Sequence, residues 1–175
     1  MHLSQRALKV LGAANEATER LSHITLAREL LSGLAERLGL ETLLADEEDM
    51  ALLEFEDAPP INLSLEEGGG IALTVYLGDA PEGDLELAEE LLASNLNWRD
   101  TDGATLSMER HSRGVFLARR WTIAELGDVQ GLSSAVEQFI VLAQRWIATF
   151  PHLRTLVTEP SNAPLAPLNF KGLRG

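Results

Sequence analysis

The chain has 175 residues, 45% of them hydrophobic, no cysteine and a formal net charge of −13. This length suits one domain, which can bury roughly 70% of the surface that its unfolded chain exposes. The lack of cysteine excludes disulfides, thiolate metal ligands and a thiol nucleophile, and the negative charge argues against binding nucleic acid. Neither an apolar run of about 18 residues nor a signal-peptide pattern is found, so we expect a cytoplasmic protein without membrane insertion.

The first part of the chain predicts a helical segment followed by a stronger helix. Residues 1–22 have weak helical periodicity and predict an N-terminal helical extension. From Thr25 onward, apolar residues recur at steps of three and four, which is typical of a helix packed on one face. Gly39 follows the last of them and can adopt the left-handed conformation that ends a helix.

Three extended runs come next. Apolar and polar residues alternate within 50–57, 61–66 and 71–77, which is the pattern of half-buried strands. Glycines 68–70 can supply the positive φ angles of a tight turn between the second run and the third. The pattern therefore predicts three consecutive strands.

The second half of the chain predicts a helix, a hairpin and a long helix. Asp84 can cap a helix over 85–94, because its carboxylate can accept hydrogen bonds from the free amides of the first turn. Two strands are predicted after it, at roughly 104–110 and 114–122. The last helix is strongly amphipathic and is expected to end at Pro151.

The order helix, three strands, helix, two strands, helix predicts an α+β fold around a twisted, mainly antiparallel sheet. We divide the chain into a helical extension at 1–22, an α+β domain at 23–150 and a mobile, proline-containing tail at 151–175. No internal repeat is evident, so the domain is expected to be a single unit.

No group of residues predicts catalysis, a metal site or a cofactor. The acidic run 46–49 lacks the spacing and the glycine of a calcium loop, and a solvated loop explains it better. Glycines 68–70 lack the Lys-Ser/Thr pair of a phosphate-binding loop. The histidines show no ligand spacing: His2, His23, His111 and His152. We predict that the protein is not an enzyme; a small hydrolase using Asp46, Glu48 and a distant histidine is the alternative.

Two further features have more than one interpretation. Trp98, Trp121 and Trp146 are typical of a core or an interface, with a ligand cage as the alternative. Arg119 and Arg120 can form a small anionic site, and a strand edge guarded by charge explains them equally well.

An ordered set of motifs runs from Leu26 to Phe150. Its members are a Leu-Leu-x-x-Asn helix end, a Thr-x-Gly-Ala turn into a strand, a helix carrying an aromatic, Ala and Trp, and acids ahead of an apolar strand. They fall at Leu91, Leu92 and Asn95; at Thr101, Gly103 and Ala104; at Phe139, Ala143 and Trp146; and at residues 45–57. In this order and spacing, the chain resembles the class I type III secretion chaperones of the Tir-chaperone family.

The resemblance implies a homodimeric chaperone in the cytoplasm of a bacterium that injects effectors. Such a protein holds the N-terminal segment of one or more effectors non-globular, soluble and secretion-competent, using apolar grooves and strand addition to a sheet edge. The implied partners are secreted effectors, a second copy of the chain and the secretion-system ATPase, and no cofactor is implied. A regulator of the same fold that sequesters a transcription or secretion factor is the alternative.

Two sets of surface residues are expected. The effector-binding groove is expected to draw on the first helix and the first three strands, at Leu26, Leu30, Leu34, Leu53, Phe55, Ile61, Leu63, Leu73 and Val75. By resemblance, the dimer interface is expected on the second helix and the hairpin, at Leu91, Leu92, Leu106, Val115 and Leu117. For each groove residue, an ordinary place in the core is the alternative.

Overall fold

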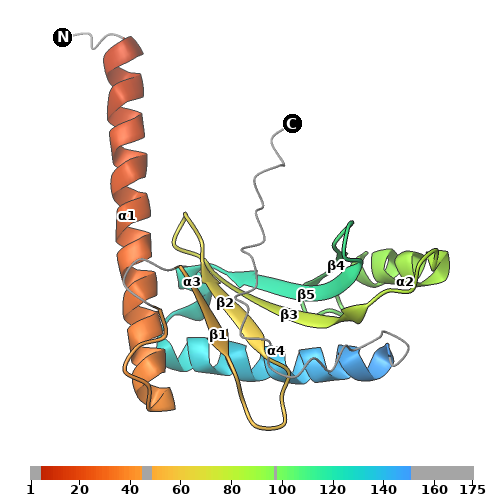
Figure 1. Ribbon diagram of the computed structural model, residues 1–175. Coiled ribbons are helices and arrows are strands. Elements are labelled where there is room, and N and C mark those ends of the chain that lie inside the picture. Colours follow the sequence, from red (N-terminus) through yellow and green to blue (C-terminus); the bar gives the residue numbers. More distant parts are fainter. Residues whose placement is uncertain (1–4, 45–48, 97, 151–175) are drawn as a thin grey trace.

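The structure, a computed structural model, describes residues 5–44, 49–96 and 98–150, and for residues 5–15 it describes the backbone alone. The helices and strands follow one another in the predicted order (Figure 1). Their bounds are α1 Gln5–Leu38, β1 Met50–Leu53, β2 Ile61–Leu65, β3 Ile71–Asp79, α2 Leu85–Asn95, β4 Thr105–Met108, β5 Gly114–Trp121, α3 Ile123–Leu126 and α4 Val129–Thr149. The predicted α+β fold class is confirmed.

Two features differ from the predicted elements. α1 is a single helix of 34 residues that passes without a break through residue 22, where we expected the extension to end. The prediction lacks α3, because four residues are too few to show helical periodicity. The available signal is a capping box, in which the side chains of Thr122 and Glu125 each accept a hydrogen bond from the other residue's N–H. The predicted tail lies outside the described residues, and the division into extension, domain and tail stays a prediction.

Aspartates begin α2 and α4. The carboxylate of Asp84 accepts a hydrogen bond from the N–H of Leu87 at 3.0 Å, as predicted for the start of α2. The carboxylate of Asp128 accepts one from the N–H of Gly131 at 2.8 Å at the start of α4. Each side chain satisfies a free amide of the first turn, which stabilises the helix by about 1 kcal/mol.

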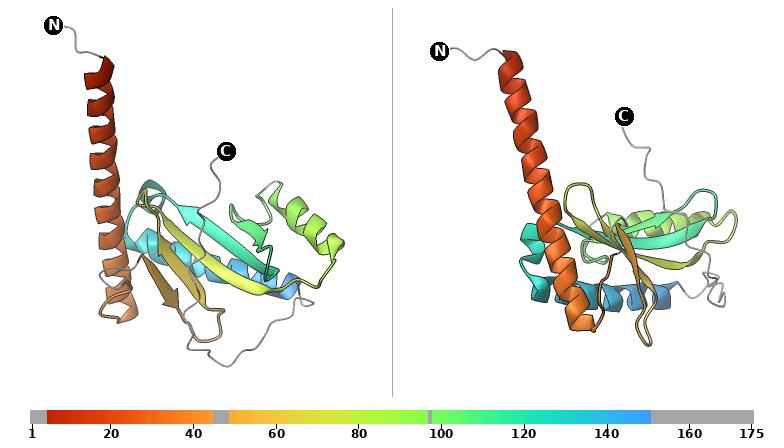
Figure 2. Two further views of the ribbon diagram at one scale, coloured as in Figure 1. Left: turned by 45° about the horizontal axis from the view of Figure 1, so that its top comes forward. Right: turned by 60° about the vertical axis from the view of Figure 1, so that its left-hand side comes forward.

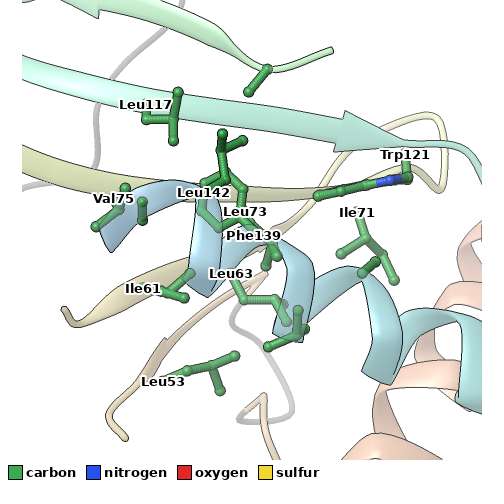
Figure 3. Packing of buried hydrophobic residues seen from close by; sticks show 14 of the residues in the cluster. Leu53, Ile61, Leu63, Ile71, Leu73, Val75, Leu117, Trp121, Phe139 and Leu142 are labelled. Atoms are coloured by element: carbon green, nitrogen blue, oxygen red, sulfur yellow. The ribbon is translucent and has the colours of Figure 1, made fainter. Parts of the chain in front are cut away.

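The five strands form one antiparallel sheet in the order β1-β2-β3-β5-β4. α4 runs across one face of this sheet (Figures 1 and 2). Leu63, Leu73 and Leu117 are buried on that face, together with Phe139 and Leu142 of α4 (Figure 3). Side chains alternate between the two faces of each strand, so the polar residues between these leucines lie on the opposite face, which we call the open face.

The C-terminal half of α1 packs against the domain. Ala27, Leu31 and Leu34 of this part are buried. A Cβ atom at Gly33 would lie 2.5 Å from Cγ2 of Val129, so this glycine allows α1 to approach the start of α4 closely. The N-terminal part extends away from the sheet (Figures 1 and 2), and residues 16–23 are exposed.

Candidate functional site

A side chain of α2 bonds to the main chain of Leu106 at the outer edge of β4. The Asn95 carboxamide donates a hydrogen bond to the C=O of Leu106 at 2.8 Å and accepts one from its N–H at 2.9 Å. These two bonds satisfy the main-chain groups that a neighbouring strand would otherwise pair with. We call this the β4 edge; a guest strand would first have to displace Asn95 to pair with it.

The outer edge of β1 is open. The C=O of Asp49 accepts a hydrogen bond from the N–H of Leu65 at 2.7 Å, and β1 continues antiparallel to β2 from that point. Because the bonds of an antiparallel pair alternate along the strand, the main-chain N–H and C=O groups of Met50 and Leu52 face away from β2. Within the described ranges no residue pairs with these groups. We call them the β1 edge.

Apolar side chains lie beside the β1 edge. Met50 is 41% exposed and Leu52 is 52% exposed, whereas Leu53, the last residue of β1, is buried. An ion pair of 2.7 Å between Arg28 and Asp49 connects α1 to the start of β1. Both partners are exposed, so this pair stabilises the fold by at most about 1 kcal/mol. Its position shows which side of α1 is next to β1.

A groove of about 640 Å³ crosses the open face of the sheet. It begins at Asp49 and Met50, next to the β1 edge, and reaches Thr105 on β4. Uncharged side chains line most of its length, and all of them except Phe116 are small or of medium size: Asn62, Ser64, Ala72, Thr74, Phe116 and Ala118. Arg120 and Glu66 add opposite charges, with a nitrogen–oxygen distance of 3.9 Å. A surface of this mixed chemistry can contact an extended chain without requiring one particular sequence.

A second apolar surface lies on the outer side of α2. Leu85, Leu92 and Leu96 are spaced by seven and four residues, which places them on one face of the helix. Together with Trp98, which follows the helix, they are between 63% and 78% exposed. We call these four residues the α2 outer face. Leu87 and Leu91 of the same helix are buried on its inner side, so α2 has apolar residues on two faces.

A model of the Tir chaperone protein (CesT) family matches residues 29–147 of the chain. The protein belongs to this family. The match begins within α1, so it leaves out most of the helix that extends away from the sheet. The resemblance inferred from the motifs is thereby confirmed. A search of curated proteins found no match.

Solved structures share the fold of this Tir-chaperone family member. A chain of the heterodimeric complex ExoU-SpcU from the type III secretion system of Pseudomonas aeruginosa is 22% identical, with a TM-score of 0.54 over 71% of this chain and 97% of that chain. A chain of the HopA1-SchA chaperone-effector complex is 16% identical, with a TM-score of 0.57 over 75% and 97%. A chain from the Yersinia pestis type III secretion chaperone SycH in complex with a fragment of YscM2 is 15% identical, with a TM-score of 0.53 over 68% and 98%.

The structure separates the expected groove residues into two groups. The larger group is buried in the core of the single chain and offers no surface to a partner: Leu34, Leu53, Ile61, Leu63, Leu73 and Val75. The physical reason is that α4 covers the inward-facing side of the sheet, while Leu34 of α1 belongs to the same buried cluster. Leu26 is exposed, and Leu30 and Phe55 are partly buried. Leu26 is two residues from Arg28 and therefore projects from a different side of α1 than the side next to β1.

The expected dimer residues divide in the same way. Leu92 lies on the α2 outer face, whereas Leu91, Leu106, Val115 and Leu117 are buried within the chain. Met50, Leu52, Leu85, Leu96 and Trp98 were missed, although all of them are exposed. Two signals in the sequence could have identified them. The β1 run Met-Ala-Leu-Leu is apolar on both sides of the strand, and α2 has a second apolar stripe.

The titratable groups explain local structure and indicate no reaction. The N–H groups of His111 and Ser112 lower the pKa of Glu109 to about 2 in the turn between β4 and β5. Hydrogen bonds from Thr122 lower the pKa of Glu125, and burial together with Asp79 raises the pKa of Tyr76.

The described residues contain no group of His, Asp and Glu suited to a metal ion. Asp46 and Glu48, the acids of the hydrolase alternative, lie outside the described residues, as do His2 and His152. No helix in the described ranges combines the length and the apolar character needed to cross a membrane.

Proposed function

We propose that this protein binds the N-terminal segment of one or more secreted effector proteins and keeps it non-globular, soluble and secretion-competent. Membership of the Tir chaperone family supports this proposal. The observation that carries it is the difference between the sheet edges: the β4 edge is occupied by Asn95, whereas the β1 edge is unpaired beside exposed Met50 and Leu52. A guest strand would therefore meet the Asn95 side chain at Leu106 of β4, whereas the groups of Met50 and Leu52 on β1 are bonded to no described residue.

The physical chemistry of such binding does not depend on the guest's exact sequence. Strand addition supplies main-chain hydrogen bonds, while alternate side chains that contact apolar surface provide selectivity. Ordering a disordered segment costs roughly 2–5 kcal/mol. Burying about 1,000 Å² of apolar surface contributes on the order of 25 kcal/mol before the costs of association. Binding thus needs no nucleotide, and we propose the secretion-system ATPase as the source of energy for release.

We also propose that the α2 outer face joins two copies of the chain into a homodimer. Leu85, Leu92 and Leu96 are exposed on one face of α2, and exposed Trp98 follows the helix; large exposed apolar surfaces of this kind often mark interaction sites. A second copy would bring the same face, so that the leucines of both helices become buried. The resulting dimer would carry two β1 edges, and one long effector segment could contact both.

The proposed role is binding without catalysis, in the cytoplasm of a bacterium that has a type III secretion system. The regulatory alternative uses the same edge and the same groove and differs only in the partner. The identity of the protein retained by the chain therefore separates the two functions: an exported effector supports the chaperone, and a transcription or secretion factor supports the regulator.

Charge placed at the β1 edge tests the proposal. Leu52→Lys puts a positive charge beside the main-chain groups that the guest would use, without removing any N–H, and edge lysines oppose strand addition. Ser107→Lys is the matched control, because it adds the same charge to β4 at the opposite side of the sheet. We expect Leu52→Lys to weaken binding of the effector's isolated N-terminal segment by at least about tenfold and the control to leave it unchanged.

The binding would be measured by calorimetry with an effector recovered from lysate of the source bacterium and shown to be exported. Equal affinities of the two variants would remove the β1 edge from the binding site. Failure to recover any exported protein, with the fold intact by circular dichroism, would contradict the proposed function itself.

A further inference from the structure

The outward-facing main-chain groups of β1 can pair with a further strand. The N–H and C=O groups of Met50 and Leu52 point away from β2 and are bonded to no described residue. Proteins usually protect such an edge with lysine, proline or a bulge, and the strand Met-Ala-Leu-Leu contains none of these. When no guest is present, the chain that is available to this edge in any solution of the protein is a second copy.

The strand β1 is complementary to itself in the antiparallel direction. If Ala51 lies opposite Ala51 of a second copy, Met50 lies opposite Leu52 of that copy, and Leu52 lies opposite its Met50. Outward-facing residues that lie opposite one another exchange N–H···O=C bonds in both directions, so the outward-facing groups of both strands are all used. Moving one strand by two residues would place Met50 or Leu52 opposite a residue outside β1. The geometry therefore favours one register.

The side chains match in the same register. Residues that lie opposite one another in an antiparallel pair project to the same face, so the exposed side chain of Met50 in each copy would contact the exposed side chain of Leu52 in the other. On the inner face, Ala51 is partly buried against the core and would meet Ala51 of the second copy. Pairing would thus bury the exposed apolar surface beside the β1 edge together with the main-chain groups.

The pairing would extend the sheet in its existing pattern, since every strand pair in it is antiparallel. The two copies would be related by a two-fold axis perpendicular to the sheet. Both inner faces, which pack on α4, would then lie on one side and both open faces on the other. Asp49 and Glu54 flank the strand, so their like charges lie at the ends of the pair, where water and salt screen the repulsion.

We infer that two guest-free copies of the chain pair through their β1 strands, antiparallel, with Ala51 opposite Ala51. This contact is separate from the α2 outer face, because α2 packs on β4 at the other side of the sheet. Two strands of four residues form a small contact, which makes the association weak and reversible. A guest that pairs with the β1 edge and also fills the groove buries more surface and displaces the second copy. Only this displacement rests on the proposed function.

A cysteine at residue 51 tests the register, because the chain has no cysteine of its own. In the inferred pair the two Cα atoms of residue 51 lie about 4.5 Å apart, within the range that a disulfide spans. Met50→Cys is the matched control: Met50 is 41% exposed on the same strand, but the two Cα atoms of residue 50 would lie about 8–9 Å apart, too far for a disulfide.

The measurement is the rate of disulfide-linked dimer formation in the guest-free full chain under air oxidation, followed on a non-reducing gel. We expect Ala51→Cys to form the dimer at least about tenfold faster than Met50→Cys. The denaturing gel separates chains that associate through α2 alone, so the proposed α2 interface does not contribute to the result. Equal rates for the two variants would overturn the inference.

A proline at residue 52 tests whether main-chain pairing is responsible. Leu52→Pro removes an outward-facing N–H and none of the bonds to β2. We expect Ala51→Cys/Leu52→Pro to form the disulfide at the rate of Met50→Cys, with the fold intact by circular dichroism. Sedimentation velocity of the parent chain and of Leu52→Pro makes the same comparison without a cysteine, and association should weaken in the variant. Disulfide formation and association that proline leaves unchanged would contradict pairing through β1.

The two proposals fail separately. If an exported effector segment binds but no disulfide specific to residue 51 forms, the pairing of copies is excluded and the chaperone function stands. If the disulfide forms but no exported protein binds, the pairing stands and the proposed function fails. If both are observed, added effector segment should slow disulfide formation in Ala51→Cys, and an unchanged rate would exclude displacement at β1.

Discussion

The two edge strands of the sheet differ in whether their outward-facing main-chain groups have a hydrogen-bond partner. At the β4 edge, the Asn95 carboxamide satisfies the main-chain groups of Leu106, and the apolar α2 outer face follows on the same helix. At the β1 edge, the groups of Met50 and Leu52 are unpaired, and acidic residues flank the strand in the sequence. The same sheet thus carries a side chain bonded to the main chain of one edge strand, whereas main-chain groups of the other edge strand are bonded to no described residue.

The largest effect is expected from a charged substitution in the α2 outer face, measured on the dimer dissociation constant. Leu92→Glu would place a charge in the proposed dimer interface, and the charge would have to be buried without a partner. We expect the dimer dissociation constant to rise by at least about 30-fold, which corresponds to about 2 kcal/mol. Val141→Glu is the control, because Val141 is similarly exposed on α4. Sedimentation equilibrium would measure both, and identical dissociation constants would refute the interface.

The next largest effect is expected on the free energy of unfolding when the Asn95 side chain is removed from the β4 edge. Asn95→Ala removes both hydrogen bonds to Leu106 and leaves its main-chain groups without a protein partner. We expect the free energy of unfolding in urea to fall by about 1–3 kcal/mol. Asn62→Ala is the control, since it removes the same side chain from the groove on the open face. A loss no greater than that of the control would show that Asn95 does not hold the edge.

The smallest effect concerns the turn that joins β4 to β5. Glu109 there has its pKa lowered from 4.5 to about 2 by the N–H groups of His111 and Ser112. Because the folded pKa lies below the unfolded one, the stabilisation is fully present above about pH 4.5 and is lost as the pH falls towards 2. An NMR titration of the carboxyl group should give a midpoint well below 4.5; a midpoint at the usual value would mean that the turn is not held this way. Glu109→Gln should remove this part of the acid sensitivity while leaving the β1 edge unaffected.

The sequence predicted much of the fold because the relevant signals are local. Asp84 was recognised as the cap of α2 from its side-chain chemistry, and the alternation within 61–66 and 71–77 identified β2 and β3. The same reasoning failed for the candidate site. Leu63 and Val75 belong to the face covered by α4, and alternation alone cannot say whether a strand's apolar side meets the protein's own helix or a guest.

The role of Asn95 also could not be predicted from local sequence patterns. The sequence marked it as part of a helix-end motif, yet its role depends on Leu106, eleven residues away, which it meets only in the folded chain. Met50 and Leu52 became candidates only when the strand order showed that β1 has a neighbour on one side.

The amino-acid sequence by itself determined the order of helices and strands, their capping residues and the motif pattern of the Tir chaperone family, because hydrophobic period and side-chain capping act over a few residues. The tertiary structure alone decided which apolar residues are covered, which sheet edge is satisfied and which is free. These outcomes depend on contacts between distant segments, since burial and main-chain pairing are properties of the assembled sheet and helices.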